Sequence, residues 1–271
     1  MTALREYVLN GEAIKGETII DAHTHTGNLR LYIPDNGPDG LLRSMDRLGI
    51  SVSLLATMLA ITVDPVAGNQ EACDAQLAHP ARIRGYAVVS PHMSGTEIRA
   101  ELERRLLQEG FAGIKLHPSQ HGYPLTGPGY APAFEFASEH GNVILAHGWT
   151  GGSLCDPQAF LRMAKRYPRV TLLLGHSGGA IEGQEESMDC ARQADNLHLD
   201  FTCSIRGYGM LERMVDRLGA ERIVFGTDST LIDPAGTLCC VLAAKIPDDD
   251  KRKILGGNAL RLFGKRLQAW E

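Results

Sequence analysis

The sequence lacks any long apolar run. None of its 271 residues belongs to a stretch of about 18 consecutive apolar residues, the length of a membrane-spanning helix, and its first residues show no secretory signal pattern. It also lacks a charge excess of one sign, because 27 Lys and Arg against 32 Asp and Glu leave a formal charge of −5. We therefore expect a cytoplasmic protein whose main partner is neither nucleic acid nor a membrane.

Cysteine is sparse as well. The six cysteines are scattered, form no Cys-x-x-Cys motif and are too few for a disulfide-stabilised scaffold, so we expect reduced thiols. Hydrophobic residues make up 44% of the chain and charged residues 22%, which is the composition of an ordinary globular protein with a sizeable core.

Short β-branched segments alternate with amphipathic ones along the whole chain, a pattern typical of β/α units around a parallel sheet. The helical pattern is clear in Thr96–Glu109, and Lys251–Leu267 is expected as a closing helix. Eight units account for nearly all of the chain, so we expect residues 1–271 to form a single (β/α)8 TIM barrel domain, a fold of about 250 residues. The predicted strands are Thr18–Thr26, Ser51–Met58, Arg84–Pro91, Phe111–Pro118, Asn142–Gly148, Val170–Ser177, Leu197–Ser204 and Arg222–Ser229.

The connections between these elements differ in length. Joins from helix to strand are short, whereas joins from strand to helix are long and rich in Gly and Pro, above all Gly27–Gly40 and Ser119–Gly129. Long loops at the C-terminal ends of parallel strands are where barrels of this kind place their sites. We expect substrate choice to depend on these loops.

Histidine is well represented and unevenly placed. Five of the ten histidines lie at or near the C-terminal ends of predicted strands, and Asp228 has the same position on the eighth strand. Residues two apart on a strand point to the same face, so these side chains can converge on one rim of a closed barrel, together with Lys115. The five histidines are His23, His25, His117, His147 and His176.

Imidazoles and one carboxylate are the ligands that zinc and similar divalent ions take in catalytic sites. Such an ion lowers the pKa of a bound water to about 7, and a nearby carboxylate such as Asp228 can accept its proton. The pattern therefore predicts a hydrolytic metal site.

Six segments in this order resemble the amidohydrolase superfamily, and in particular its amidohydrolase-related ("amidohydrolase 2") branch of metal-dependent hydrolases and decarboxylases. The resemblance extends from about Thr18 to Phe263. The segments are Ile20–His25, Gly113–Pro118, Ile144–Gly148, Gly175–Gly179, Phe225–Ser229 and Ile254–Ala259.

The resemblance implies roles for individual residues. It implies that a first metal ion is held by His23, His25, His147 and Asp228. His176 matches the histidine that either binds a second ion or orients the water or substrate. The implied cofactor is a divalent ion, zinc first and manganese second, as one or two ions.

The fourth strand departs from the family pattern. Lys115 matches a position that carries a carboxylated, metal-bridging lysine in two-metal members, but we favour a simple pairing with a carboxylate such as Asp21 or Asp228. His117 lies two residues on and is expected to contact substrate or to support a ligand. Trp149 is the best candidate for a wall of the substrate pocket.

We expect an enzyme that activates water to cleave an amide, lactone or other ester bond in a small polar metabolite, with Asp228 and His176 as catalytic residues. The alternative is a non-oxidative decarboxylase of an aromatic or unsaturated acid on the same scaffold, with Arg30 or Arg206 to hold the carboxylate. A third possibility is a catalytically silent barrel. The expected partner is a small-molecule substrate, and the sequence leaves a homo-oligomer open.

Overall fold

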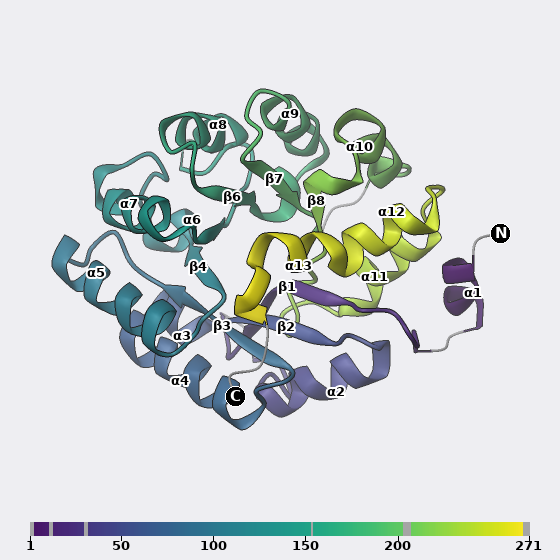
Figure 1. Cartoon of the computed structure of the whole chain (residues 1–271), viewed down its shortest axis with the longest axis horizontal. Helices are drawn as coiled ribbons and strands as arrows, with labels where there is room; N and C mark the ends of the chain where they lie inside the picture. Colours follow the sequence, from purple (N-terminus) through teal and green to yellow (C-terminus); the bar gives the residue numbers. More distant parts are fainter. Residues whose placement is uncertain (1–2, 11–12, 30–31, 153, 203–206, 268–271) are drawn as a thin grey trace.

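The computed structural model describes residues 3–10, 13–29, 32–152, 154–202 and 207–267. Eight parallel strands follow one another around a central barrel in chain order, and helices surround them (Figure 1). The architecture is the expected (β/α)8 barrel. The strands are β1 (Ile20–Thr26), β2 (Val52–Thr57), β3 (Ile83–Val88), β4 (Gly113–Leu116), β5 (Val143–Ala146), β6 (Thr171–Leu174), β7 (Leu197–Asp200) and β8 (Ile223–Val224).

The barrel closes between its first strand and the segment that follows its last. Ala22 N donates to the Phe225 carbonyl at 3.0 Å, Asp228 N donates to the His23 carbonyl at 2.8 Å, and a parallel bridge joins Thr24 to Ser229. These bonds join β1 to the segment directly after β8, whose regular part is only two residues long. They also fix Asp228 directly beside the histidine pair of β1.

Helices connect the strands, and several of them begin with the same N-terminal cap. Asp64, Asp156 and Asp233 each precede a proline, and each carboxylate accepts a backbone N–H from the first turn of its helix. The helices are α1 (Ala3–Asn10), α2 (Pro38–Leu48), α3 (Met58–Thr62), α4 (Pro65–Ala78), α5 (Gly95–Leu102), α6 (Pro118–His121), α7 (Ala131–His140), α8 (Pro157–Arg166), α9 (Ile181–Ala191), α10 (Met210–Leu218), α11 (Pro234–Ala243), α12 (Asp248–Arg252) and α13 (Asn258–Phe263).

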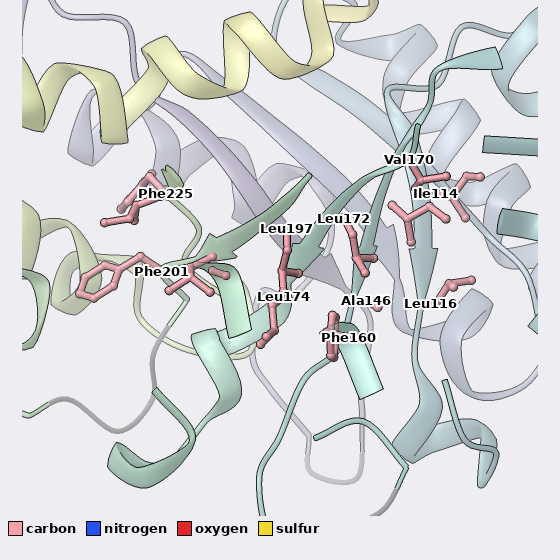
Figure 2. Packing of buried hydrophobic residues seen from close by; sticks show 14 of the residues in the cluster. Ile114, Leu116, Ala146, Phe160, Val170, Leu172, Leu174, Leu197, Phe201 and Phe225 are labelled. Carbon is pink, nitrogen blue, oxygen red and sulfur yellow. The ribbon is translucent and has the colours of Figure 1, made fainter. Parts of the chain in front are cut away.

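Alternate strand residues pack into two apolar layers. Leu172 and Leu174 of β6 face the surrounding helices and pack with neighbours such as Phe160 of α8 (Figure 2). Leu173 between them belongs to the cluster inside the barrel. The inner cluster includes Phe263 of α13, whose ring lies 6.1 Å from that of Tyr86. Apolar packing therefore fills the barrel below the site and leaves its upper rim to polar side chains.

The eight predicted strands are confirmed, but most of them end earlier than the sequence suggests. The stretch after β4 turns into α6 at Pro118, and the stretch after β6 forms a 3-10 turn, η3 (Gly175–Gly178). The expected helix at Thr96–Glu109 consists of α5 followed by a π-helical segment, η1 (Glu103–Gln108). Within the described residues, no helix is both long and apolar enough to span a membrane.

Candidate metal centre

Strand β1 contributes two buried histidines whose ring protons are both fixed. His25 Nδ1 donates to the Ala56 carbonyl at 2.7 Å, and His23 Nδ1 donates to Asp200 Oδ2 at 2.7 Å. A neutral imidazole carries one proton, so a proton held at Nδ1 leaves a lone pair at Nε2. Both rings thus present the Nε2 atom that a metal ion requires.

His176 reaches the same region from the turn after β6. Its backbone is left-handed, with φ 56° and ψ 15°, a conformation that non-glycine residues adopt rarely and that clusters at functional sites. His176 Nδ1 donates to the Thr202 carbonyl at 2.8 Å, so its Nε2 also carries a lone pair. The sequence placed His176 on a strand, whereas the structure shows that the chain turns there to aim the ring.

Asp228 lies four residues beyond β8 and has φ 67°, again in the left-handed region. Its Oδ1 lies 3.2 Å from His25 Nε2 and 3.7 Å from His23 Nε2. Burial acts to raise the pKa of this carboxyl, but the adjacent rings of His25, His176 and His23 lower it well below its usual range. Asp228 is therefore an ionised carboxylate.

The ligand atoms of His23, His176 and Asp228 all lie within 4.8 Å of one another, and His25 contacts the same carboxylate. Two imidazole nitrogens and a carboxylate oxygen are donors that zinc or manganese accepts, and each ring is oriented by a second hydrogen bond. In the described part of the chain no other group of this kind is found. The residues present fit a divalent ion.

Lys115 of β4 lies next to these ligand residues. It is fully buried, and its Nζ lies 2.5 Å from His23 Nε2. Burial lowers the pKa of Lys115 to about 8, while Asp228 and Asp200 act in the opposite direction. The sequence suggested either a metal bridge or a carboxylate partner for this lysine. In the structure its Nζ contacts the imidazole of His23, and the metal bridge stays a prediction.

His117 has a different protonation pattern from the three histidines above. It lies just beyond β4 as the N-cap of α6, where its Nδ1 accepts the backbone N–H of Gln120 at 3.3 Å. Burial lowers the pKa of His117 well below its usual value, so the ring is neutral and carries its proton on Nε2. This ring therefore offers a donor to the site, which suits substrate binding.

His147 and Trp149 follow β5 and line the site with flat surfaces. The His117 and His147 rings are stacked with centroids 4.1 Å apart, and Trp149 lies parallel to His147 with centroids 6.2 Å apart. His147 and Trp149 are half-buried. His147 is not a member of the three-residue ligand group, although its ring lies 4.6 Å from that of His176. The sequence grouped it with the ligands on the basis of resemblance.

Asp200 and Thr202 at the end of β7 were missed by sequence reasoning. Asp200 accepts from His23 Nδ1 and from the backbone N of His176, and Thr202 accepts from His176 Nδ1. The available signal was a carboxylate at the C-terminal end of a buried strand, with a polar residue two positions on. Asp21, named from the sequence as a possible partner of Lys115, accepts the backbone N–H of His23 at 3.2 Å.

The two arginines considered for a substrate carboxylate, Arg30 and Arg206, lie outside the described residues. His198 is at the start of β7 and lines a cavity with residues of α8 and α13, away from the ligand group.

The chain is similar to known proteins in both sequence and structure. The sequence model of a family described as amidohydrolase matches residues 20–265. The structure resembles that of 5-carboxyvanillate decarboxylase from Sphingomonas paucimobilis, with 18% identity, a TM-score of 0.70 and coverage of 92% of this chain and 99% of the other.

Two further solved structures show the same fold. One is a dihydroxybenzoic acid decarboxylase from Polaromonas with bound manganese and the inhibitor 2-nitroresorcinol, at 19% identity, a TM-score of 0.69 and coverage of 92% and 97%. The other is 4-oxalomesaconate hydratase from Rhodopseudomonas palustris, at 18% identity, a TM-score of 0.69 and coverage of 92% and 96%. At this level of identity the similarity shows the barrel fold.

Proposed function

The chain belongs to the amidohydrolase family, and on that premise we propose that it is a metal-dependent decarboxylase of a small aromatic or unsaturated carboxylic acid. The ion in this proposal is manganese or zinc, held by His23, His25, His176 and Asp228, with His147 at its side. The partner is a small-molecule substrate. Two structural relatives that are decarboxylases support this function above the hydrolase function that the sequence favoured.

The placement of Lys115 and His117 carries the proposal. Lys115 lies on β4 and His117 directly follows it. Both carry N–H groups and lie next to the ligand histidines, whose Nε2 atoms carry lone pairs. Two donors from one strand, one of them cationic, make a site for an anionic group such as a carboxylate. The parallel rings of His117, His147 and Trp149 add a flat surface against which a planar substrate can lie.

The residues have separate tasks in the reaction. A bound divalent ion supplies positive charge that stabilises the electron pair left behind when carbon dioxide departs. His117 Nε2–H donates to the substrate carboxylate and orients it. The bond between the carboxyl carbon and its neighbour breaks, carbon dioxide leaves, and the Lys115 ammonium gives a proton to the carbon that keeps the electron pair. Lys115 then regains a proton from water. In the metal-free protein burial lowers the pKa of Lys115 to about 8, which favours release of its proton.

A second candidate function rests on Asp228. This carboxylate is ionised and lies beside the ligand nitrogens, where it can accept a proton from a water that attacks an ester or amide. Asp228→Asn abolishes turnover in this scheme. The variant should fold normally because the side chain is 13% exposed and Asn has the same shape.

A paired substrate screen tests the proposal. The metal-loaded protein is offered aromatic and unsaturated acids labelled with carbon-13 at the carboxyl group, and in parallel a set of lactones, esters and amides. We expect labelled carbon dioxide from the first set, detected by mass spectrometry. Hydrolysis of the second set with no carbon dioxide from the first would replace the decarboxylase by the hydrolase. Metal content is measured on the same preparation.

A further inference from the structure

We infer that Asp200 is a positioning residue that sets the ring proton of His23 and the backbone of His176 at the same time. His23 belongs to β1 and His176 to the turn after β6, and Asp200 at the end of β7 is hydrogen-bonded to both. This inference goes beyond the proposed decarboxylation. It concerns the metal-free protein, and only its consequence for metal affinity rests on the proposed function.

One carboxylate oxygen makes both contacts. Asp200 Oδ2 accepts from His23 Nδ1 at 2.7 Å and from the backbone N of His176 at 3.2 Å. The other oxygen, Oδ1, accepts from Thr202 Oγ1 at 2.5 Å. Asp200 is 1% exposed and His23 1% exposed, so water does not offer an alternative partner. The carboxylate is thus held by Thr202 while it holds the two histidines.

The contact with His23 decides which nitrogen can bind a metal ion. An imidazole beside an acceptor at Nδ1 keeps its proton there and leaves Nε2 with a lone pair. Without Asp200 no acceptor holds the proton at Nδ1, and Asp228 Oδ1, 3.7 Å from Nε2, then competes with Lys115 for that nitrogen and can draw the proton to it. The position of Lys115 Nζ, 2.5 Å from Nε2, agrees with a lone pair on that atom, because the ammonium can only donate.

The contact with His176 supports an unfavourable backbone. His176 and Ser177 are both left-handed, with φ 56° and φ 48°. The Ser177 hydroxyl donates to the Asp200 carbonyl at 2.8 Å, so the side chain and the main chain of Asp200 hold two successive residues of this turn. The strained turn and the tautomer of His23 therefore depend on one residue.

The surroundings leave Asp200 little freedom. A Cβ atom on Gly226 would lie 2.1 Å from Thr202 Oγ1, 2.5 Å from Asp200 Oδ1 and 2.8 Å from His23 Cβ. Only glycine therefore fits at position 226, because any side chain would collide with Thr202, Asp200 and His23. Such close packing fixes the carboxylate in one orientation.

Nitrogen-15 NMR of the metal-free protein tests the inference without turnover or metal. The His23 signals are assigned by their loss in His23→Gln. We expect protonated Nδ1 and unprotonated Nε2 in the wild type, and a proton shared between the two nitrogens in Asp200→Ala. A wild-type spectrum with the proton on Nε2 overturns the inference at once, whether or not the Asp200 variants fold.

Two further variants separate positioning from a merely structural role. In Asp200→Asn the amide oxygen takes the Oδ2 position, because the backbone N–H of His176 needs an acceptor there. The amide nitrogen then takes the Oδ1 position and donates to the Thr202 hydroxyl. The oxygen still accepts from His23 Nδ1, so we expect the wild-type tautomer of His23. Asp21→Asn is the matched control, because Asp21 is equally buried but binds the backbone of His23 and not its ring. A tautomer change in Asp21→Asn equal to that in Asp200→Ala would contradict a specific role.

The consequence for the metal centre is measured by titration with Co²⁺, whose visible spectrum reports the ligands. We expect 10- to 100-fold weaker binding in Asp200→Ala, the usual effect of removing a group that orients a ligand, and a smaller loss in Asp200→Asn. If the tautomer changes as expected and the wild type binds no Co²⁺, the inference on Asp200 holds and the metal-dependent function fails. An unchanged affinity in Asp200→Ala overturns the positioning role.

Discussion

The ammonium of Lys115 lies 2.5 Å from Nε2 of His23, in the position from which a metal ion would approach that nitrogen. His23 Nδ1 is already committed to Asp200, so Nε2 is the atom that both cations would share. A metal ion bound to His23 must therefore displace Lys115 from this contact. The displaced ammonium remains inside a buried site and needs a new negative partner, a role that the substrate carboxylate would fill in the proposed decarboxylation.

Replacing Lys115 by Met should affect metal binding and catalysis in opposite directions. The change removes a positive charge next to the ion, so we expect tighter binding of Mn²⁺ by about tenfold, and it removes the proton donor, so kcat should fall by about 10² to 10⁴. Isothermal titration with Mn²⁺ and steady-state kinetics on the best carboxylate substrate measure the two effects. Equal losses of metal and activity would show instead that Lys115 is itself a ligand.

Lys251→Met provides the control for that variant. Lys251 is also fully buried, but its Nζ donates to the Leu242 carbonyl at 2.7 Å, in a part of the structure away from the ligand group. We expect lower stability and unchanged metal affinity. The comparison separates loss of a buried lysine in general from loss of the one that contacts His23.

His117→Phe should weaken substrate binding with little effect on the chemical step. Phenylalanine keeps a ring stacked on His147 but has no N–H to offer a carboxylate. We expect KM to rise about tenfold with kcat within a factor of a few, the behaviour of a group that binds ground state and transition state alike. A collapse of kcat at constant KM would assign the proton donor to His117 and not to Lys115.

The sequence was informative where the chain is regular. Alternation of apolar segments located all eight strands, and the spacing of His23 and His25 on β1 placed two rings on one face. It was less informative where the chain leaves the strand geometry. His176 and Asp228 reach the ligand group through left-handed residues, and periodicity carries no signal for such turns.

Asp200 shows why supporting residues are harder to predict than ligands. Nothing in the sequence near Asp200 resembles a motif, because its partners His23 and His176 are 177 and 24 residues away. Such contacts arise only when the closed barrel brings β1, β6 and β7 together. Likewise the protonated nitrogen of His117 depends on its position as the cap of α6, which the sequence reading extended as strand.

Acid should destabilise the protein in part through His198. Burial, with smaller effects of Arg222 and Arg261, lowers the pKa of His198 from its usual value near 6.5 to about 4. Between these pH values the unfolded chain binds a proton at this residue and the folded chain does not, so stability falls as the pH falls from 6.5 to 4. A shift of this size corresponds to at most about 3 kcal/mol.

The contribution of His198 is isolated by comparing denaturant unfolding of the wild type and His198→Gln at pH 7 and pH 4.5. Glutamine does not titrate in this range, so the variant should lose less stability on acidification, by about 1 to 3 kcal/mol. Burial also lowers the pKa of His121 to about 4, but the contribution of His121 to acid sensitivity is the same in both proteins and cancels in the comparison. Identical acid sensitivity of the two proteins would contradict a neutral, buried His198.

Gly179→Ala should disturb the wall of the site through Trp149. Gly179 has φ 81°, and a Cβ there would lie 2.4 Å from Trp149 Cδ2, so the indole must move and the backbone is strained. We expect a loss of about 1 to 3 kcal/mol in stability and a higher KM. We also expect a change in the fluorescence of Trp149, which is identified as the signal lost in Trp149→Phe. Gly152→Ala is the control in the adjoining loop, because a Cβ there meets nothing within 4 Å. If both alanine variants raise KM equally, loop flexibility and not the position of Trp149 governs substrate binding.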